Sequence, residues 1–185
     1  MRILVAYGSD FGSTKGIAER IGERLRGPAL DVDVESVEGS IDPTRYDAFV
    51  IGSAIQAGHW LTSATGFVRR NEAVLARRPV WLFSSGPIGD RAVDAPQPDP
   101  KEIGEFRRAI DPRAHIVFGG AYDRETADFQ GKDFLTRTLA KRFMPDGDWR
   151  DWDAIERWAD GIAVELGGRG GGTRTHDLVL PKHVR

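Results

Sequence analysis

The stretch that decides the fold is Ile3-Leu4-Val5-Ala6-Tyr7-Gly8-Ser9-Asp10-Phe11-Gly12-Ser13-Thr14-Lys15, near the amino terminus. Its first part, Ile3 to Tyr7, is a continuous apolar run, which is typical of a parallel strand covered on both faces. The second part is polar and contains glycine. After it, Ile17, Ile21 and Leu25 fall four apart, on one face of a helix. The pattern therefore predicts a strand, a tight loop and a helix.

The loop from Ser9 to Thr14 has the chemistry of a phosphate cradle. Its glycines let backbone amides converge, the hydroxyls of Ser9, Ser13 and Thr14 supply neutral donors, and the start of the helix adds its dipole. The lysine and spacing of a P-loop are missing, and so is the glycine spacing of a dinucleotide fingerprint. From these residues alone, a second interpretation stays open, in which Ser13 or Thr14 only caps the helix.

The rest of the chain repeats the alternation of strand and helix. Further apolar runs predict strands at 32–37, 48–52, 80–84 and 116–120. Helical spacing recurs among Phe67, Val68, Val74 and Leu75, and again among Trp152, Ile155, Trp158, Ala159, Ile162 and Leu166. This order predicts an α/β fold: a doubly wound, five-stranded parallel sheet with helices on both faces.

Two stretches interrupt the alternation. Residues 87–100 contain four prolines and predict a loop that leads to a short helix near 102–110. Residues 123–151 predict an insertion with its own helix, in which apolar residues are interspersed with Lys132, Arg137, Lys141 and Arg142. This helix fits either a membrane surface or the edge of the sheet with its charges in solvent.

The composition bounds the chemistry. The length fits one domain, 1–166, followed by a glycine-rich tail, 167–185, that we expect to be disordered. There is no cysteine, so redox chemistry requires a cofactor, and the tail histidines lack the spacing of a metal site. We expect no bound metal.

Charge and hydropathy point to a cytoplasmic protein that does not bind nucleic acid. The tail carries a net charge of +3, which leaves −5 on the body. A nucleic-acid binder would show a basic face across the fold. The apolar run at the amino terminus is far too short for a secretory signal or a membrane span.

Three polar loops follow the strands predicted to lie at the centre of the sheet: residues 9–14, 53–60 and 84–89. All three are rich in glycine and serine, and the second adds aromatic residues. Open α/β sheets bind ligands beyond the carboxyl ends of their strands, so we expect these loops to form one site.

These residues resemble a known family. The opening loop, the segment Tyr46-Asp47-Ala48-Phe49-Val50-Ile51-Gly52-Ser53-Ala54-Ile55-Gln56-Ala57-Gly58-His59-Trp60 and the run Ser84-Ser85-Gly86 are similar to flavodoxins. More narrowly, they resemble the flavodoxin-domain group that contains menaquinone-dependent protoporphyrinogen oxidase. The Ile-Gly-x-x-Ile-x-x-Gly-His segment of that group is matched from Ile51 to His59. The resemblance covers roughly residues 2–166 and implies a flavodoxin-like sheet.

The resemblance also implies a cofactor, FMN. The competing hypothesis is a binding module that keeps the phosphate loop but holds another ligand, such as a deazaflavin, or no redox cofactor. The residues implied to bind the phosphate are Ser9, Asp10, Phe11, Gly12, Ser13 and Thr14. Those implied to flank the isoalloxazine ring are Ser53, Ala54, Ile55, Gln56, Gly58, His59, Trp60, Ser84, Ser85, Gly86, Pro87 and Gly89. Two features depart from electron-carrier flavodoxins, because the body is only mildly acidic and the third loop has no aromatic residue.

His59 and Trp60 are the candidate catalytic residues. We expect Trp60 to stack on the flavin, because a large apolar side chain in a ligand loop is costly to expose. His59 either hydrogen-bonds flavin or substrate, or braces its loop. The implied activities are hydrogen transfer from a porphyrinogen to a quinone, plain electron carriage, or binding of a deazaflavin without FMN. The expected partner is a small-molecule or protein redox partner, with contact at the inner face of the membrane if it is a quinone.

Overall fold

The computed structural model describes residues 1–89, 97–125, 138, 142 and 144–167. The strands are β1 (Arg2–Gly8), β2 (Asp31–Ser36), β3 (Ala48–Gln56), β4 (His59–Trp60), β5 (Val80–Ser85), β6 (Ala114–Phe118), β7 (Ala121–Tyr122) and β8 (Gly147–Asp148). The helices are α1 (Ser13–Leu25), η1 (Pro43–Arg45), α2 (Thr62–Arg70), α3 (Glu72–Leu75), α5 (Ile103–Ile110) and α7 (Trp152–Gly167).

The main sheet confirms the predicted flavodoxin-like architecture. Its strands run in the order β2-β1-β3-β5-β6, and every neighbouring pair is parallel. This order reverses at β1, which lies between β2 and β3, as in doubly wound sheets with a single switch point. The short strand β4 adds to β3 in the antiparallel sense, and β7 and β8 form a separate two-stranded sheet.

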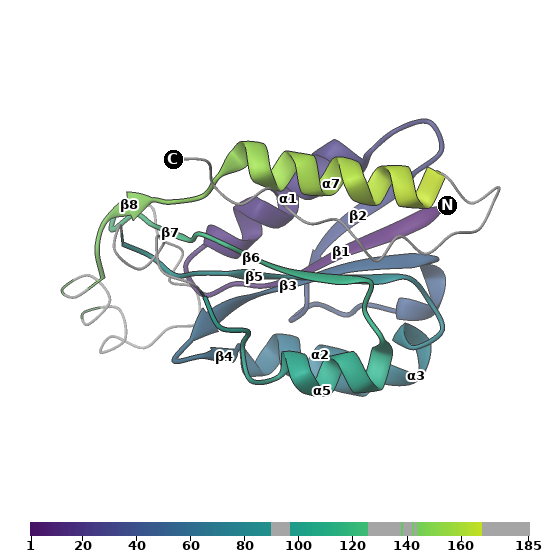
Figure 1. Ribbon diagram of the computed structural model, residues 1–185, viewed down its shortest axis with the longest axis horizontal. Coiled ribbons are helices and arrows are strands. Elements are labelled where there is room, and N and C mark those ends of the chain that lie inside the picture. The colour runs from purple at the N-terminus through teal and green to yellow at the C-terminus, as the bar shows by residue number, and fades with distance from the viewer. Residues whose placement is uncertain (90–96, 126–137, 139–141, 143, 168–185) are drawn as a thin grey trace.

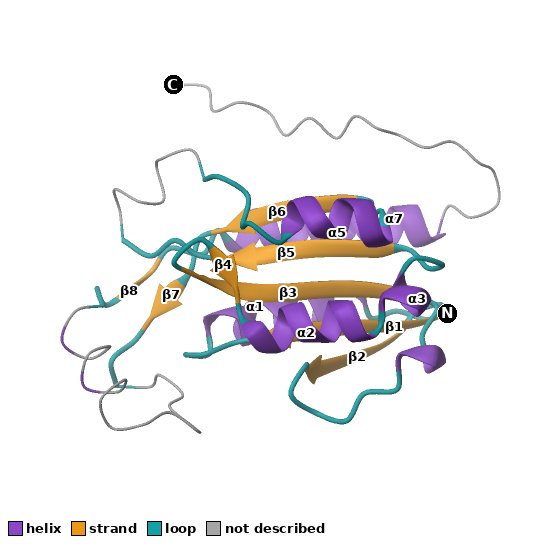
Figure 2. Cartoon of the chain, turned by 90° about the horizontal axis from the view of Figure 1, so that it is seen from below, coloured by secondary structure: helices purple, strands orange, loops and turns teal. Residues whose placement is uncertain are grey.

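Helices cover both faces of the sheet (Figure 1). On β1, Ile3 and Val5 pack with α1 and α7, whereas Leu4 and Ala6 pack with α2, α3 and α5. Successive side chains of a strand point to opposite faces, so a continuous apolar run is what a strand between two helical layers requires. Figure 2 shows α2 and α5 lying along the strands of the second face.

The largest differences from the predicted bounds concern three elements. The apolar positions between Phe67 and Leu75 belong to two helices, α2 and α3, which are separated at Asn71. The strand predicted at 116–120 is β6, which begins and ends two residues earlier, so Gly119 and Gly120 lie beyond it. The second polar loop is largely a hairpin, because β3 continues to Gln56 and turns back into β4.

Two predicted features lie outside the described residues. They are the tail, of which the structure describes only Gly167, and the helix of the insertion, of which it describes Thr138 and Arg142. Within the described part of the chain, no helix is both long and apolar enough to cross a membrane.

Candidate functional site

A cavity of about 580 Å³ lies at the carboxyl end of the parallel sheet. The strands end on the left in Figure 1. Its walls are formed by residues at or beyond the ends of β1, β3, β5 and β6. This is the edge at which open α/β sheets bind their ligands, and the switch in strand order lies between β1 and β3. The volume falls within the roughly 300–1,000 Å³ of small-molecule sites.

The three polar loops predicted from the sequence meet in this cavity. The predicted residues that line it are Ser9, Asp10, Phe11, Ser13, Thr14, Ala54, Ile55, Gln56, Gly58, Ser85, Gly86 and Pro87. The predicted residues that do not line it are Gly12, Ser53, His59, Trp60, Ser84 and Gly89. Three of this second group, Ser53, Trp60 and Ser84, are buried.

Gly12 shapes the first loop. It precedes α1 with a φ of 89° and a ψ of −15°, a left-handed conformation in which an L side chain is strained. Its amide donates a hydrogen bond to Ser9 Oγ over 3.1 Å, so Ser9 braces the turn. The amides of the first turn of α1 have no intrahelical acceptor, and with the helix dipole they favour an anion.

Thr14 separates the two interpretations of this loop. Its side chain is fully buried, its Oγ1 has no hydrogen-bond partner among the described residues, and it lines the cavity. Leaving a buried hydroxyl unsatisfied costs about 1–3 kcal/mol. No side chain caps α1, so helix capping does not explain the hydroxyl-rich loop. A ligand oxygen in the cavity would supply the acceptor that Thr14 lacks.

Ser13 joins the first loop to two other walls of the cavity. Its Oγ accepts a hydrogen bond from the Ala121 amide over 2.9 Å and lies 3.1 Å from Ser85 Oγ. The Ser13 hydroxyl keeps its own proton, which it can donate either to Ser85 or to a ligand. Three strand ends are thereby tied together at the point where the phosphate was predicted to bind.

Gln56 and Asp10 connect the first and second loops. The Gln56 side-chain amide donates a hydrogen bond to Asp10 Oδ2, and both residues line the cavity. A carboxylate beside a phosphate is electrostatically unfavourable, which makes the direction of Asp10 important. The hydrogen bond from the Gln56 side chain holds the Oδ2 atom of Asp10 against the second loop.

The hairpin between β3 and β4 explains why Gly58 reaches the cavity. Ala57 and Gly58 have φ values of 50° and 79°, so the two central residues of the turn are both left-handed. Turns of this type match the twist of the strands that they join. Behind the turn, the buried Ser53 Oγ accepts a hydrogen bond from the Leu61 amide over 3.0 Å and donates one to the Ala54 carbonyl over 2.9 Å.

Trp60 lies in the core rather than in the wall of the cavity, so its position does not support the predicted stacking on a flavin. The prediction was that a flavin would cover a ring that is costly to expose, but the protein itself covers it. Trp60 is 3% exposed, packs edge-on against Phe106 at 5.3 Å and does not line the cavity. Its indole N–H donates to Ser84 Oγ over 2.8 Å. Trp60 is therefore part of the core between the hairpin and α5, because burial there satisfies both its apolar ring and its polar N–H.

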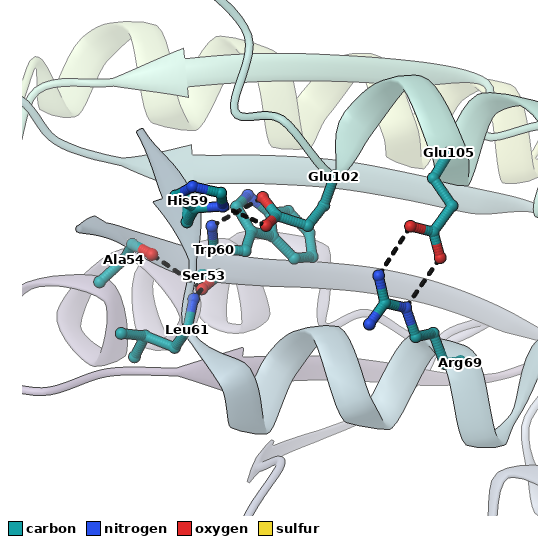
Figure 3. Close-up of polar contacts among 8 residues, drawn as sticks. All are labelled: Ser53, Ala54, His59, Trp60, Leu61, Arg69, Glu102 and Glu105. Atoms are coloured by element: carbon teal, nitrogen blue, oxygen red, sulfur yellow. Dashed lines mark hydrogen bonds and ion pairs between the residues drawn. The ribbon is translucent and has the colours of Figure 1, made fainter. Parts of the chain in front are cut away.

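His59 lies beside the cavity, next to Gly58, with a side chain that is 46% exposed. Its Nδ1 is 2.7 Å from Glu102 Oε1, and the other carboxylate oxygen of Glu102 accepts from the Trp60 amide over 3.0 Å (Figure 3). Burial opposes a charge on Glu102, but the hydrogen bonds from Trp60 and His59 outweigh it, so the pKa of Glu102 lies below its ordinary value. Glu102 thus braces the strand that carries His59.

Sequence reasoning missed part of the cavity wall. The additional lining residues are Ile88, Gln97, Pro98, Asp99, Pro100, Gly120, Ala121 and Met144. The Gly119-Gly120 pair was a usable signal, because it follows a strand of the same parallel sheet, but it was assigned to the strand itself. Nothing in the spacing of residues 97–100 indicates that this proline-rich segment folds back over the site.

The comparison with protein families identifies a match over most of the chain. The profile of the family described as Flavodoxin domain matches residues 4–138. Protoporphyrinogen IX dehydrogenase [quinone] of Escherichia coli strain K12 is 28% identical over 86 residues, which are 45% of this chain and 48% of that protein. The chain therefore matches about half the length of this curated relative.

Solved structures agree on the fold. A flavodoxin from the domain Archaea superposes with a TM-score of 0.56 at 20% identity, covering 90% of this chain and 99% of that one. A cysteine-to-serine mutant of flavodoxin from Pseudomonas aeruginosa gives 0.57 at 15% identity, with 91% and 100% covered. Rubredoxin oxygen:oxidoreductase from Desulfovibrio gigas gives 0.58 at 12% identity, with 91% and 36% covered.

Proposed function

The chain belongs to the flavodoxin domain family, and on that premise we propose that it is a redox protein that binds FMN in the cavity described above. The observation that carries this proposal is the buried, unpartnered hydroxyl of Thr14, a residue at the start of α1 that lines a cavity of suitable size. Bound FMN would supply one- and two-electron transfer, which no side chain of this cysteine-free protein provides.

The donors of the first loop suit a phosphate monoester held without a positive charge. None of the described residues that line the cavity is Lys or Arg. Thr14 Oγ1, the Ser13 hydroxyl and the free amides of α1 would hold the phosphate through neutral donors and the helix dipole. The opposite walls, formed by Ile55, Gly58 and Pro87, would flank the flat ring and exclude water from it.

The finer version of the proposal is a flavoenzyme that takes hydrogen from a porphyrinogen and passes electrons to a quinone. Its support is the dehydrogenase that is 28% identical to this chain over 86 residues and whose name includes a quinone. The apolar side chains Ile88, Pro98, Pro100 and Met144 also give the cavity a wall that suits an apolar co-substrate. His59 would then act at the edge of the ring, where its exposed imidazole meets the substrate.

A plain electron carrier is the second candidate. One observation favours it: the fold covers 99–100% of the length of two flavodoxins. In this version the exposed His59 and the hairpin contact a protein partner, and no small substrate enters. Both versions of the proposal place the protein in the cytoplasm. Only the quinone version also requires contact with the inner face of a membrane.

A spectrum followed by two assays separates these proposals. The absorption of the purified protein distinguishes FMN from a deazaflavin. The loaded protein is then given a porphyrinogen with a menaquinone analogue under anaerobic conditions, and separately a flavodoxin reductase. Porphyrinogen oxidation supports the enzyme, whereas reduction without porphyrinogen turnover supports the carrier. Absence of any bound or titratable flavin contradicts both.

A further inference from the structure

A chain of hydrogen bonds runs through the core from the cavity wall to the hairpin. Asp99, which lines the cavity, has its Oδ1 3.0 Å from His115 Nδ1. His115 Nε2 lies 2.8 Å from Ser84 Oγ, which in turn accepts the indole N–H of Trp60 over 2.8 Å. The four residues come from the segment before α5, from β6, from β5 and from β4, so the chain joins elements that are far apart in the sequence.

The direction of these bonds follows from the groups themselves. The indole nitrogen of Trp60 only donates, so Ser84 Oγ accepts from it and directs its own proton to His115 Nε2. With Nε2 as acceptor, the proton of a neutral His115 is on Nδ1, from which it is donated to the Asp99 carboxylate. A single tautomer of His115 therefore satisfies every member of the chain.

The order Ser84, His115, Asp99 is that of a hydrolase triad, but its placement excludes nucleophilic catalysis. Ser84 is fully buried, does not line the cavity and already accepts a hydrogen bond from Trp60. A nucleophile must reach the substrate with its oxygen. The arrangement instead fixes the positions of the two outer residues, Asp99 and Trp60.

The charges around His115 agree with a neutral imidazole. Its side chain is 1% exposed, and burial lowers its pKa. The Asp99 carboxylate opposes this shift, while Arg107 of α5 adds to it and pairs with the second oxygen of Asp99 at 2.7 Å. The neighbours of the imidazole on β5 and β4, Ser84 and Trp60, are uncharged.

Lys101 and Glu102, which follow Asp99 closely in the sequence, also contact the hairpin directly. Glu102 Oε2 accepts the Trp60 amide, as Figure 3 shows, and the Lys101 amide donates to the Gly58 carbonyl over 3.1 Å. Residues 99–102 thus reach Trp60 by two routes. Glu102 contacts the Trp60 backbone directly, and Asp99 connects to the Trp60 side chain through His115 and Ser84. Both Asp99 and Gly58, at the two ends of these contacts, line the cavity.

We propose that His115 is a positioning residue of the cavity, which fixes the wall at 97–100 through Asp99 and the hairpin through Ser84 and Trp60. The proposal rests on the proposed function only in taking the cavity to be the FMN site. The substitutions His115→Phe and Asp99→Ala each break the chain at a different point. Asp99→Asn keeps an oxygen that accepts from Nδ1, and Arg113→Gln breaks an ion pair with Glu165 just before the other end of β6.

The first test uses the protein without cofactor. The indole N–H signals of the five tryptophans are recorded by ¹⁵N NMR, and Trp60→Phe assigns the signal of Trp60. We expect His115→Phe and Asp99→Ala to move this signal and to speed its exchange with solvent, and Asp99→Asn and Arg113→Gln to leave it near its original position. Because Asp99 is 40% exposed, Asp99→Ala remains informative even if His115→Phe does not fold. An unchanged Trp60 signal in Asp99→Ala overturns the proposal.

The second test titrates FMN into the same variants. We expect Asp99→Ala and His115→Phe to weaken binding by roughly tenfold, the loss expected when one hydrogen bond to a charged group is broken. Asp99→Asn restores most of the affinity. Wild-type affinity in Asp99→Ala overturns the positioning role. If the original protein binds no FMN, the proposed function fails, and the Trp60 signal alone decides the role of His115.

Discussion

The indole N–H of Trp60 lies 2.8 Å from Ser84 Oγ, to which it donates a hydrogen bond inside the core. This contact joins the hairpin of β3 and β4 to the neighbouring strand β5, behind the wall of the cavity rather than within it. The ring of Trp60 also packs against Phe106 of α5. A residue that the sequence placed beside the cofactor therefore supports the site from the core.

Trp60→Phe should lower stability rather than change the flavin spectrum. Phenylalanine keeps most of the ring but removes the donor to the buried Ser84, and such a loss costs about 1–3 kcal/mol. Urea unfolding measures the loss, and the absorption spectrum of the loaded variant should match that of the original protein. A displaced spectrum with unchanged stability would show that the ring contacts the flavin.

Two glycine substitutions should act in opposite directions. Gly12→Ala places a side chain at a φ of 89°, which costs about 1–2 kcal/mol even though no heavy atom lies within 4 Å of the new Cβ. Gly161→Ala, in α7 and with equally open space, should raise stability by roughly 0.5–1 kcal/mol. Thermal unfolding compares the pair. Equal effects would contradict the left-handed turn at Gly12.

On the flavoenzyme version of the proposed function, His59→Ala should lower turnover and leave FMN bound. The His59 side chain does not line the cavity and is nearly half exposed, so its removal should change FMN affinity by no more than about twofold. Glu102→Ala is the contrasting variant, because it also removes the acceptor of the Trp60 amide. Titration and turnover are measured on both. Weaker FMN binding by His59→Ala, with turnover per bound flavin unchanged, would contradict this division of roles.

His115 should make stability depend on pH in a defined window. Its pKa in the folded protein is below the ordinary value of 6.5, chiefly because it is buried. Between these two pKa values the unfolded chain binds more protons, so stability rises with pH and is lost as pH falls below about 6.5. Urea unfolding from pH 7.5 downward should show this slope, and His115→Phe should lack it. An equal slope in both proteins would show that His115 does not cause it.

The sequence predicted the sheet well because the determinants of a parallel sheet are local. Continuous apolar runs such as Ile3 to Tyr7 are buried on both faces, and α1 follows from the four-residue spacing of Ile17, Ile21 and Leu25. The cavity followed for the same reason, since loops at the carboxyl ends of parallel strands must lie at one edge.

The features that the sequence did not predict depend on contacts between distant segments. Ala57 at a positive φ closes the hairpin, although alanine is not a residue that signals such a turn. Trp60 and the segment at 97–100 acquire their positions from Ser84, His115 and Glu102, which no spacing in the sequence connects. Polar residues of this kind resemble loop residues until the tertiary structure pairs them.

The central claim is that the cavity binds the FMN phosphate through the hydroxyl of Thr14. Thr14 and Thr65 are a matched pair, because both are buried and both have an Oγ1 without a partner among the described residues, but only Thr14 lines the cavity. Replacing either threonine with valine preserves its shape. The decisive measurement is titration of FMN into the two cofactor-free variants. Thr14→Val should raise the Kd for FMN about tenfold or more, as expected for one hydrogen bond to a charged group, with Thr65→Val equal to the original protein. Equal affinity in all three proteins would contradict the assignment of the cavity.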